Sequence, residues 1–300
     1  MTLLASMLLC TGMLWAGQFE DGFAAYERGD YAVAKSVLQP LATQGDVHAQ
    51  FVLGLTYYLG QGTTQDYAEA RKWFRLAAVQ GQSAAQFSLG AMYAEGRGIF
   101  QDYSEALKWY RLAAAQGNSS AQFSLGSLYV EGQGTTQDYA EAIKWYQLAA
   151  MQGHASAQLA LGVMYANGKG TTQDYAEAMK WYRMAAVQGD STGQSLVGGM
   201  YGEGRGTTQD YAEALKWYRL AAMQGNSLAQ YGLGVMYFAG HGVAQDDVRA
   251  HMWFNLSAAS GEKTAAQGRD AAAKHMTAQQ VMQAQKMASN CMKSNYKNCE

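Results

Sequence analysis

The sequence predicts an all-α protein, an α/α solenoid of six 36-residue helix-turn-helix repeats with a helical cap at each end. The first observation is the spacing of tryptophans, which stand 36 residues apart at Trp73, Trp109, Trp145, Trp181, Trp217 and Trp253. Glycines that can end helices keep the same period, from Gly45 to Gly261. The third observation is composition, because 34 glycines, one proline and 12% aromatic residues suit helices joined by glycine turns. A β-sandwich would need more Val, Ile and Thr.

The bulk composition narrows the class of protein. Apolar residues make up 49% of the chain and charged residues 15%, so the chain can bury a large surface and fold. With 22 basic and 24 acidic residues, the net charge of −2 leaves no positive surplus to neutralise a phosphate backbone. We therefore expect no nucleic-acid partner.

Residues 1–16 have the pattern of a signal peptide. Thr2 to Trp15 are apolar apart from small polar residues, and Ala16 and Gly17 precede the first acidic residues. The apolar run is shorter than the roughly 20 residues that span a bilayer. The pattern predicts a periplasmic or secreted protein without a stable membrane span. The alternative is a cytoplasmic protein with an apolar N-terminal helix.

Each repeat contains a first helix, helix A, whose apolar residues share one face. The repeats are residues 46–81, 82–117, 118–153, 154–189, 190–225 and 226–261. In the second repeat, Ala85, Leu89 and Met92 follow helical spacing. Gly90 lies beside this face, and a glycine inside a helix costs roughly 0.5–1 kcal/mol against alanine. Its recurrence in all six repeats predicts that another helix approaches closely there.

The second helix of each repeat, helix B, begins after a Gly-x-Gly turn. In the second repeat Gly96 and Gly98 form this turn, and Asp102 with Glu105 matches a capping box in which both side chains bond backbone amides. Trp109 shares the inner face of helix B with alanines. We expect the Trp and Tyr rings to pack in the core between neighbouring repeats. An aromatic binding groove is the alternative.

The repeated motifs resemble those of the Sel-1-like repeat family, relatives of the tetratricopeptide repeats. In the third repeat they read Ala121-Gln122, Leu125-Gly126, Tyr129-Val130-Glu131-Gly132-Gln133-Gly134, Gln137-Asp138-Tyr139-Ala140-Glu141-Ala142 and Lys144-Trp145-Tyr146. The resemblance implies a right-handed superhelix that binds proteins and has helix A on its concave side. Residues 17–45 resemble a shorter, tetratricopeptide-like N-terminal cap.

The chain after the last repeat, residues 262–300, reads as capping helices and a tail. Thr277 and Gln280 match a further capping box, which precedes a closing helix rich in Met and Gln. Removal of the leader would leave two cysteines, Cys291 and Cys299, and an even count in an exported chain favours a disulfide between them. Two free thiols on a frayed tail are the alternative.

The sequence offers little chemistry beyond this framework. Its five histidines lack the spacing of a zinc motif, and Gly60-Gln61-Gly62 follows a helix and recurs as a turn, so we expect neither metal nor cofactor. Ser260 and Ser294 each precede a lysine by three residues, as in penicillin-interacting enzymes, but the companion motifs are missing. We expect no enzymatic activity. The alternative is a β-lactam- or peptidoglycan-interacting hydrolase of the cysteine-rich Sel-1-like type.

If the family geometry carries over, the exposed stripe of helix A would be the binding face. The stripe residues vary between repeats while the core positions barely change, and the candidates are Ser88, Glu95, Ser124, Glu131, Asn167, Leu196 and Glu203. The first repeat has bulkier residues in these slots, Val52 among them. We expect a shallow groove for an extended peptide or a basic partner segment, on a monomeric adaptor or scaffold of the cell envelope. The alternative is an inner wall that merely tolerates small residues. A loop row of Arg97, Lys169, Arg205 and His241 is expected to be a solvated edge.

Overall fold

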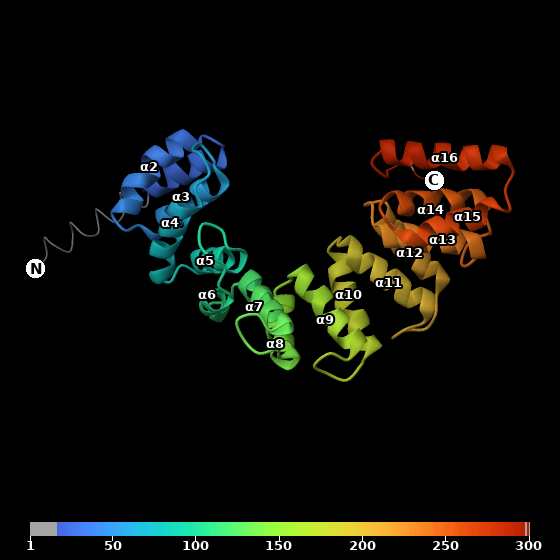
Figure 1. Ribbon diagram of the computed structural model, residues 1–300, viewed down its shortest axis with the longest axis horizontal. Helices are drawn as coiled ribbons and strands as arrows, with labels where there is room; N and C mark the ends of the chain where they lie inside the picture. Colours follow the sequence, from blue (N-terminus) through green and yellow to red (C-terminus); the bar gives the residue numbers. More distant parts are fainter. Residues whose placement is uncertain (1–16, 298, 300) are drawn as a thin grey trace, which may run out of the picture. The chain divides into compact units, whose positions relative to one another are not determined.

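The computed structural model describes residues 17–297 and 299, and these residues form helices with no strand (Figure 1). In chain order, a helix at residues 17–27 is followed by α2 (Tyr31–Thr43), α3 (Val47–Leu59), α4 (Tyr67–Val79), α5 (Ser83–Glu95), α6 (Tyr103–Ala115), α7 (Ser119–Glu131), α8 (Tyr139–Met151), α9 (Ala155–Asn167), α10 (Tyr175–Val187), α11 (Ser191–Glu203), α12 (Tyr211–Ala222), α13 (Ser227–Ala239), α14 (Asp247–Ala259), α15 (Lys263–Ala273) and α16 (Ala278–Lys293). The signal-peptide prediction falls on residues 1–16, outside the described residues. Within residues 17–297, none of the helices combines the length and hydropathy that a membrane span requires.

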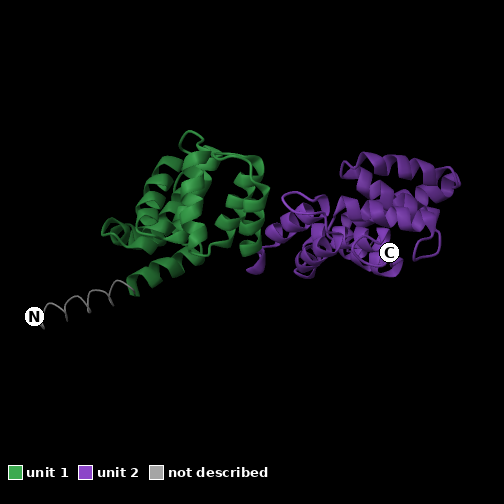
Figure 2. Cartoon of the chain, turned by 90° about the horizontal axis from the view of Figure 1, so that it is seen from below, with its two compact units in different colours: residues 1–149 green, residues 150–300 purple. Residues whose placement is uncertain are grey.

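The chain divides into two compact units, residues 1–149 and 150–300, with the boundary inside α8 (Figure 2). In the first unit, helix A contacts helix B within a repeat, as in α3 with α4 and α5 with α6, and α4 and α6 contact the next helix A. The second unit repeats this order through α9 to α14. The prediction of an all-α solenoid is confirmed.

The glycine inside helix A makes room for a ring of helix B. A Cβ added at Gly90 would lie 2.7 Å from Cδ1 of Tyr110, closer than real Cβ contacts allow. The same conflict with a ring recurs at Gly54, Gly126, Gly162, Gly198 and Gly234. The predicted close approach of the two helices is confirmed, because only glycine lets the ring lie against the backbone of helix A.

The Gly-x-Gly turn docks on the preceding repeat. Gly96 ends α5 in the left-handed conformation with φ of 69°. Gly98 also has positive φ, and a Cβ there would lie 2.6 Å from Cβ of Tyr67 at the start of α4. The second glycine is therefore required by both its φ angle and the contact between repeats.

The capping prediction for helix B is half right. Asp102 accepts hydrogen bonds from the amides of Ser104 and Glu105, as an N-cap should. Glu105 does not bond back to the backbone, because its carboxylate pairs with Lys108 one turn along α6. At α16, by contrast, Thr277 and Gln280 form the complete capping box that the sequence predicts.

The tryptophans are less buried than predicted. Trp73 and Trp253 are 8% and 2% exposed, but the four tryptophans between them are only partly buried. In four repeats the ring that follows the tryptophan is the more buried one, namely Phe74, Tyr110, Tyr146 and Tyr182, whereas Trp253 and Phe254 are equally buried and Tyr218 is partly buried like Trp217. In those four repeats the Tyr or Phe after the tryptophan, and not the indole, therefore provides the main aromatic packing.

The C-terminal cap covers the last repeat. Helices α15 and α16 both contact α14. Cys291 at the end of α16 is bonded to Cys299, with 4.6 Å between their Cα atoms, and both are buried. The bridge draws the tail back onto α16.

Candidate functional site

The residues predicted to line the groove are divided between the two units. Ser88, Glu95, Ser124 and Glu131 lie in the first unit, and Asn167, Leu196 and Glu203 in the second. The serines and Leu196 are half-buried, and the other four are exposed. Val52 is buried, so the stripe expected on the first repeat is wrong at that position.

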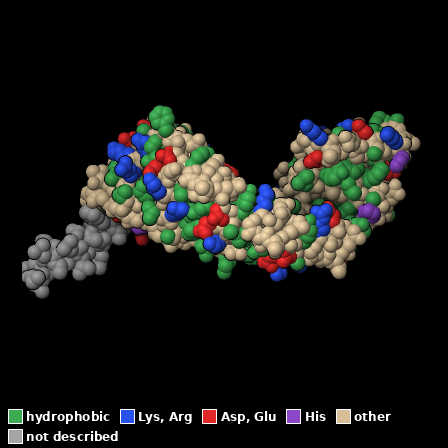
Figure 3. All heavy atoms as spheres, turned by 60° about the horizontal axis from the view of Figure 1, so that its bottom comes forward, with side chains coloured by type: hydrophobic (Ala, Val, Ile, Leu, Met, Phe, Trp, Pro, Cys, Tyr) green, Lys and Arg blue, Asp and Glu red, His purple; other side chains and the backbone are tan. Residues whose placement is uncertain are grey.

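The glutamates of the stripe offer less free negative charge than the sequence suggests. Glu95 pairs with Arg97 at 2.7 Å, and Glu203 pairs with Arg205 at 2.8 Å. Glu131 has no ion pair within residues 17–297, because its turn carries Gln133 where the other two carry arginine. On the face drawn in Figure 3, acidic and basic side chains are interspersed. A strongly acidic groove is therefore not supported.

Tyrosine hydroxyls of helix B reach the helix A face, which sequence reasoning missed by assigning these rings to the core alone. Tyr110 hydrogen-bonds Ser124 of the next helix A, and burial raises the pKa of Tyr110 to about 12. The hydroxyl of Tyr146 lies 3.1 Å from Oγ of Ser127. The serines at these helix A positions, which differ between repeats, were the sequence signal that could have indicated this contact.

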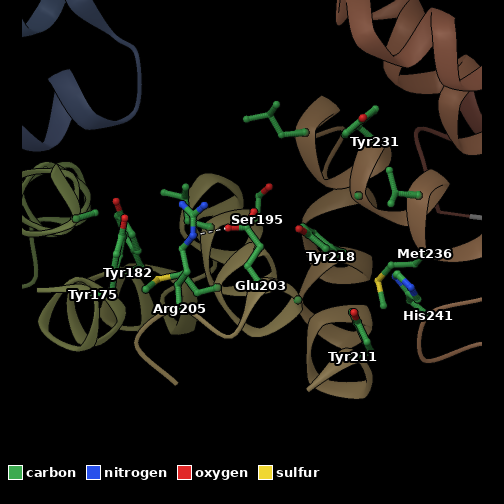
Figure 4. Close-up of a pocket in the computed structure, with 18 residues that line it drawn as sticks. Tyr175, Tyr182, Ser195, Glu203, Arg205, Tyr211, Tyr218, Tyr231, Met236 and His241 are labelled. Atoms are coloured by element: carbon green, nitrogen blue, oxygen red, sulfur yellow. Dashed lines mark ion pairs between the residues drawn. The ribbon is translucent and has the colours of Figure 1, made fainter. Parts of the chain in front are cut away.

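A pocket of about 550 Å³ opens in the second unit, between helices α9 to α13 and the turns that follow helix A (Figure 4). Its aromatic lining comprises Tyr175, Tyr182, Tyr211, Tyr218 and Tyr231. Glu203, Arg205 and His241 add charged or titratable groups. Of the predicted site residues, only Leu196 and Glu203 line this pocket. Its size is that of a site for a small ligand or a few side chains.

The tyrosine hydroxyls of the pocket fall into two groups. Those of Tyr175 and Tyr211 accept hydrogen bonds from Gln173 and Gln209. Those of Tyr182, Tyr218 and Tyr231 have no hydrogen-bond partner among the described residues. Tyr182 is only 5% exposed, and in Figure 4 the hydroxyl end of Tyr218 is turned toward the side that carries Glu203 and Arg205.

Burial raises the pKa of two of the pocket's phenols further above neutral pH. It raises the pKa of Tyr182 to about 12, and burial followed by the charge of Glu203 raises the pKa of Tyr218 to about 12. Both phenols are therefore protonated at neutral pH and can donate hydrogen bonds to a ligand.

The loop row of Arg97, Lys169, Arg205 and His241 is exposed, as expected of a solvated edge, and three of its members also lie over tyrosines of the preceding repeat. Arg205 lies over the ring of Tyr175 at 5.6 Å, and His241 stacks on Tyr211 with 4.4 Å between ring centroids. In the first unit, Arg97 likewise lies over Tyr67. These cationic and imidazole groups join consecutive repeats and, in the second unit, contribute to the pocket.

The serines of the two Ser-x-x-Lys matches lie outside this pocket. Ser260 donates a hydrogen bond to the carbonyl oxygen of Leu256, and Ser294 donates to that of Cys291. Within residues 17–297 and 299, no group of three His, Cys, Asp or Glu side chains is arranged to hold a metal ion.

The repeat pattern corresponds to a known family model. The Sel1 repeat model matches residues 47–82, 83–118, 119–154, 155–190, 191–226 and 227–262, each range starting one residue after the repeat defined from the sequence. No curated protein matches the chain.

Two solved structures are similar over most of the chain. A Sel1 repeat protein from Oxalobacter formigenes is 34% identical, with a TM-score of 0.71, and the match covers 80% of this chain and 96% of that one. The protein c5321, a protective antigen present in uropathogenic Escherichia coli strains and displaying an SLR fold, is also 34% identical. Its TM-score is 0.67, and the match covers 95% of this chain and 74% of that one.

Proposed function

The chain belongs to the Sel1 repeat family, and we propose on this basis that it is a non-catalytic scaffold that binds a protein or an extended peptide along its helix A face. Sel1 repeat proteins are generally protein-interaction scaffolds. We assign this chain to the cell envelope because of its leader-like first 16 residues, and we expect it to act as a monomer.

The observation that carries the proposal is the helix A face itself. The helix A residues on this face differ from repeat to repeat. In the second unit they border a tyrosine-lined pocket, where some of the hydroxyls have no hydrogen-bond partner among the described residues. Hydroxyls that line a pocket and have no protein partner are available to hydrogen-bond a ligand there. The pocket's carboxylate is paired with Arg205, and the phenols of Tyr182 and Tyr218 are protonated, which favours binding over nucleophilic catalysis.

Site-specific photo-crosslinking in the native cell tests the binding face. A photoreactive residue would replace Ser124 or Leu196 on helix A, and matched controls would replace Leu112 or Leu220 on helix B, which are 50% and 49% exposed. We expect the same partner to be captured from the two helix A positions and not from the helix B positions. Capture from the helix B positions alone would contradict the proposal.

The non-catalytic part of the proposal has its own test. Wild type and Ser260→Ala would be assayed with a chromogenic β-lactam, and we expect neither to turn it over. Sustained turnover by the wild type that disappears in the variant would favour the hydrolase instead.

The compartment is tested by fractionation. The full chain should be found in the periplasm or medium, and a variant without residues 1–16 should remain in the cytoplasm. Identical distributions of the two proteins would contradict the assignment to the envelope.

A further inference from the structure

The pocket lies where one slot of helix A holds its smallest residue; this slot carries a ring in four of the six repeats, Leu159 in the fourth and Ser195 in the fifth. Helix A of the first three repeats carries Phe51, Phe87 and Phe123 in one slot, and each packs on a ring of its own helix B. The ring centroids lie 5.8, 5.7 and 5.5 Å apart, respectively. In the fifth repeat the same slot holds Ser195, so Tyr218, the corresponding ring of helix B, receives no phenyl ring from α11.

Two glycines lie beside Tyr218: Gly199 leaves its hydroxyl without a neighbouring side chain, and Gly232 makes room for the Tyr218 ring itself. In the third repeat, Ser124 and Ser127 occupy the slots that contact the neighbouring tyrosine hydroxyls. The corresponding residues around Tyr218 are Gly232 of α13 and Gly199 of α11. Neither glycine is common to all repeats, unlike Gly198. A Cβ at Gly232 would lie 2.7 Å from Cζ of Tyr218, so the ring position depends on this glycine, whereas Gly199 has room for a side chain. The missing ring and the two missing hydroxyls leave both a ring-sized space and an unpaired phenol.

We propose that this pocket binds an aromatic side chain of an extended partner peptide, whose ring replaces the missing helix A ring on Tyr218. This inference rests on the proposed function and specifies its ligand. The hydroxyls of Tyr182, Tyr218 and Tyr231 then donate hydrogen bonds to carbonyl oxygens of the peptide backbone. The volume of about 550 Å³ accommodates one such side chain together with the backbone beside it.

The charges of the pocket favour an uncharged ring over a basic side chain. Glu203 is already paired with Arg205, and His241 lines the same pocket. A lysine or arginine of the partner would have to displace Arg205 and would meet like charge from it. An aromatic ring gains contact with tyrosine faces and edges and breaks no ion pair.

The test uses methionine methyl groups as reporters, because Met200 and Met236 line the pocket. Protein carrying ¹³C-methyl methionine would be titrated with acetyl-Gly-Gly-Phe-Gly-Gly-amide and, in parallel, with the Leu and Lys versions of this peptide and with N-acetylglucosamine. We expect saturable shifts of Met200 and Met236, with the Phe peptide binding at least about tenfold more tightly than the Lys peptide. Met92, the counterpart of Met200 in α5, should not shift.

Two variants fill the pocket without disturbing the fold. Ser195→Phe restores the ring that earlier repeats carry. Gly199→Ser places a Cβ 3.4 Å from the Tyr218 hydroxyl, which is an ordinary contact, and supplies the hydroxyl that Ser127 supplies to Tyr146. Each should retain or raise Tm and weaken binding of the Phe peptide at least about tenfold. Ala91→Ser, in the slot of Gly199 but on α5, should leave binding unchanged.

The outcomes separate this inference from the proposed function. Phe-peptide shifts that vanish in both variants support the pocket, whatever partner crosslinking captures. Absence of shifts, shifts that persist in both folded variants, or a preference for the Lys peptide or the sugar would overturn it. Crosslinking from the helix A face would then still support a scaffold that binds elsewhere along that face.

Discussion

At the scale of single residues, a ladder of buried glutamines joins each helix A to the preceding helix B. In α5, the side-chain amide of Gln86 donates to the carbonyl oxygen of Ala78 at 3.1 Å, and its oxygen accepts from Gln116 at 2.7 Å. The second unit repeats this arrangement at Gln158 with Gln188 and at Gln194 with Gln224. Each glutamine thus adds a bond between repeats to a carbonyl oxygen that also accepts a backbone amide, as Ala78 does from Gly81 at 3.0 Å.

The ladder breaks in the sixth repeat, which leads to the first prediction. Ser260 stands where the earlier repeats have the outer glutamine, and Oε1 of Gln230 is buried without a partner. Ser260→Gln should complete the pair and raise the free energy of unfolding by about 1 kcal/mol, because one buried acceptor becomes satisfied. Chemical denaturation measures the change. Ser260→Asn is the control, since its shorter side chain should not reach Gln230; an equal gain from both variants would contradict the explanation.

These residue contacts were only partly accessible from sequence. The recurrence of Gln86 and Gln116 could be read as repeat motifs, but their pairing joins positions thirty residues apart, near the two ends of one repeat. The contact of Arg205 with Tyr175 also spans thirty residues, but between neighbouring repeats. Periodicity identifies which residues recur, whereas the register between helices decides which of them meet.

At the scale of the helices, the N-cap residue of helix A changes between repeats while its capping role is kept. Asp46, Asn118 and Asp190 accept a hydrogen bond from the amide three residues later, as N-caps do. In the fourth repeat the cap is His154, whose Nδ1 accepts from the amide of Ala157 at 3.3 Å. Nδ1 can accept only while it is unprotonated. Burial lowers the pKa of His154, so the folded protein favours this neutral form.

This cap predicts a pH-dependent loss of stability. Because the pKa of His154 is lower in the folded state, its contribution is complete above pH 6.5, the ordinary value, and declines as the pH falls toward the folded pKa. His154→Asn should therefore flatten the fall of Tm between neutral and mildly acidic pH, as scanning calorimetry would show. The cap itself contributes about 0.5–2 kcal/mol.

The reciprocal substitution is the control for this prediction. Asn118→His should introduce an acid-dependent loss in the third repeat. The pKa of His251 is also lowered, by burial first and then by Arg269, so a residual slope will remain in every variant. An unchanged slope in His154→Asn would show that the cap does not titrate as argued.

At the scale of the whole molecule, the sequence predicted the repeats but neither the two units nor the pocket. The repeat pattern runs unbroken through Ala149 and Ala150, where the units divide, so no change in composition marks this boundary. The pocket arises where Ser195, Gly199 and Gly232 depart from the pattern. In the sequence, each of these three residues would be interpreted as a tolerated substitution. Only the fold shows that all three surround Tyr218.

The last prediction concerns the closed end of the array. In a repeat protein each element is stabilised mainly by its neighbours, so a cap protects the repeat beneath it. The bond between Cys291 and Cys299 holds the tail against α16, which covers α14. Opening this short loop should cost about 2–3 kcal/mol by the loop-entropy argument. Reductant should therefore increase hydrogen exchange in α14 and α16 and leave exchange in α3 to α6 unchanged.

The control is a Cys291→Ser, Cys299→Ser double variant. It should exchange like the reduced protein, and reductant should not change its exchange. Two free thiols at these positions after alkylation without reductant, or loss of protection spread evenly over both units, would contradict the prediction.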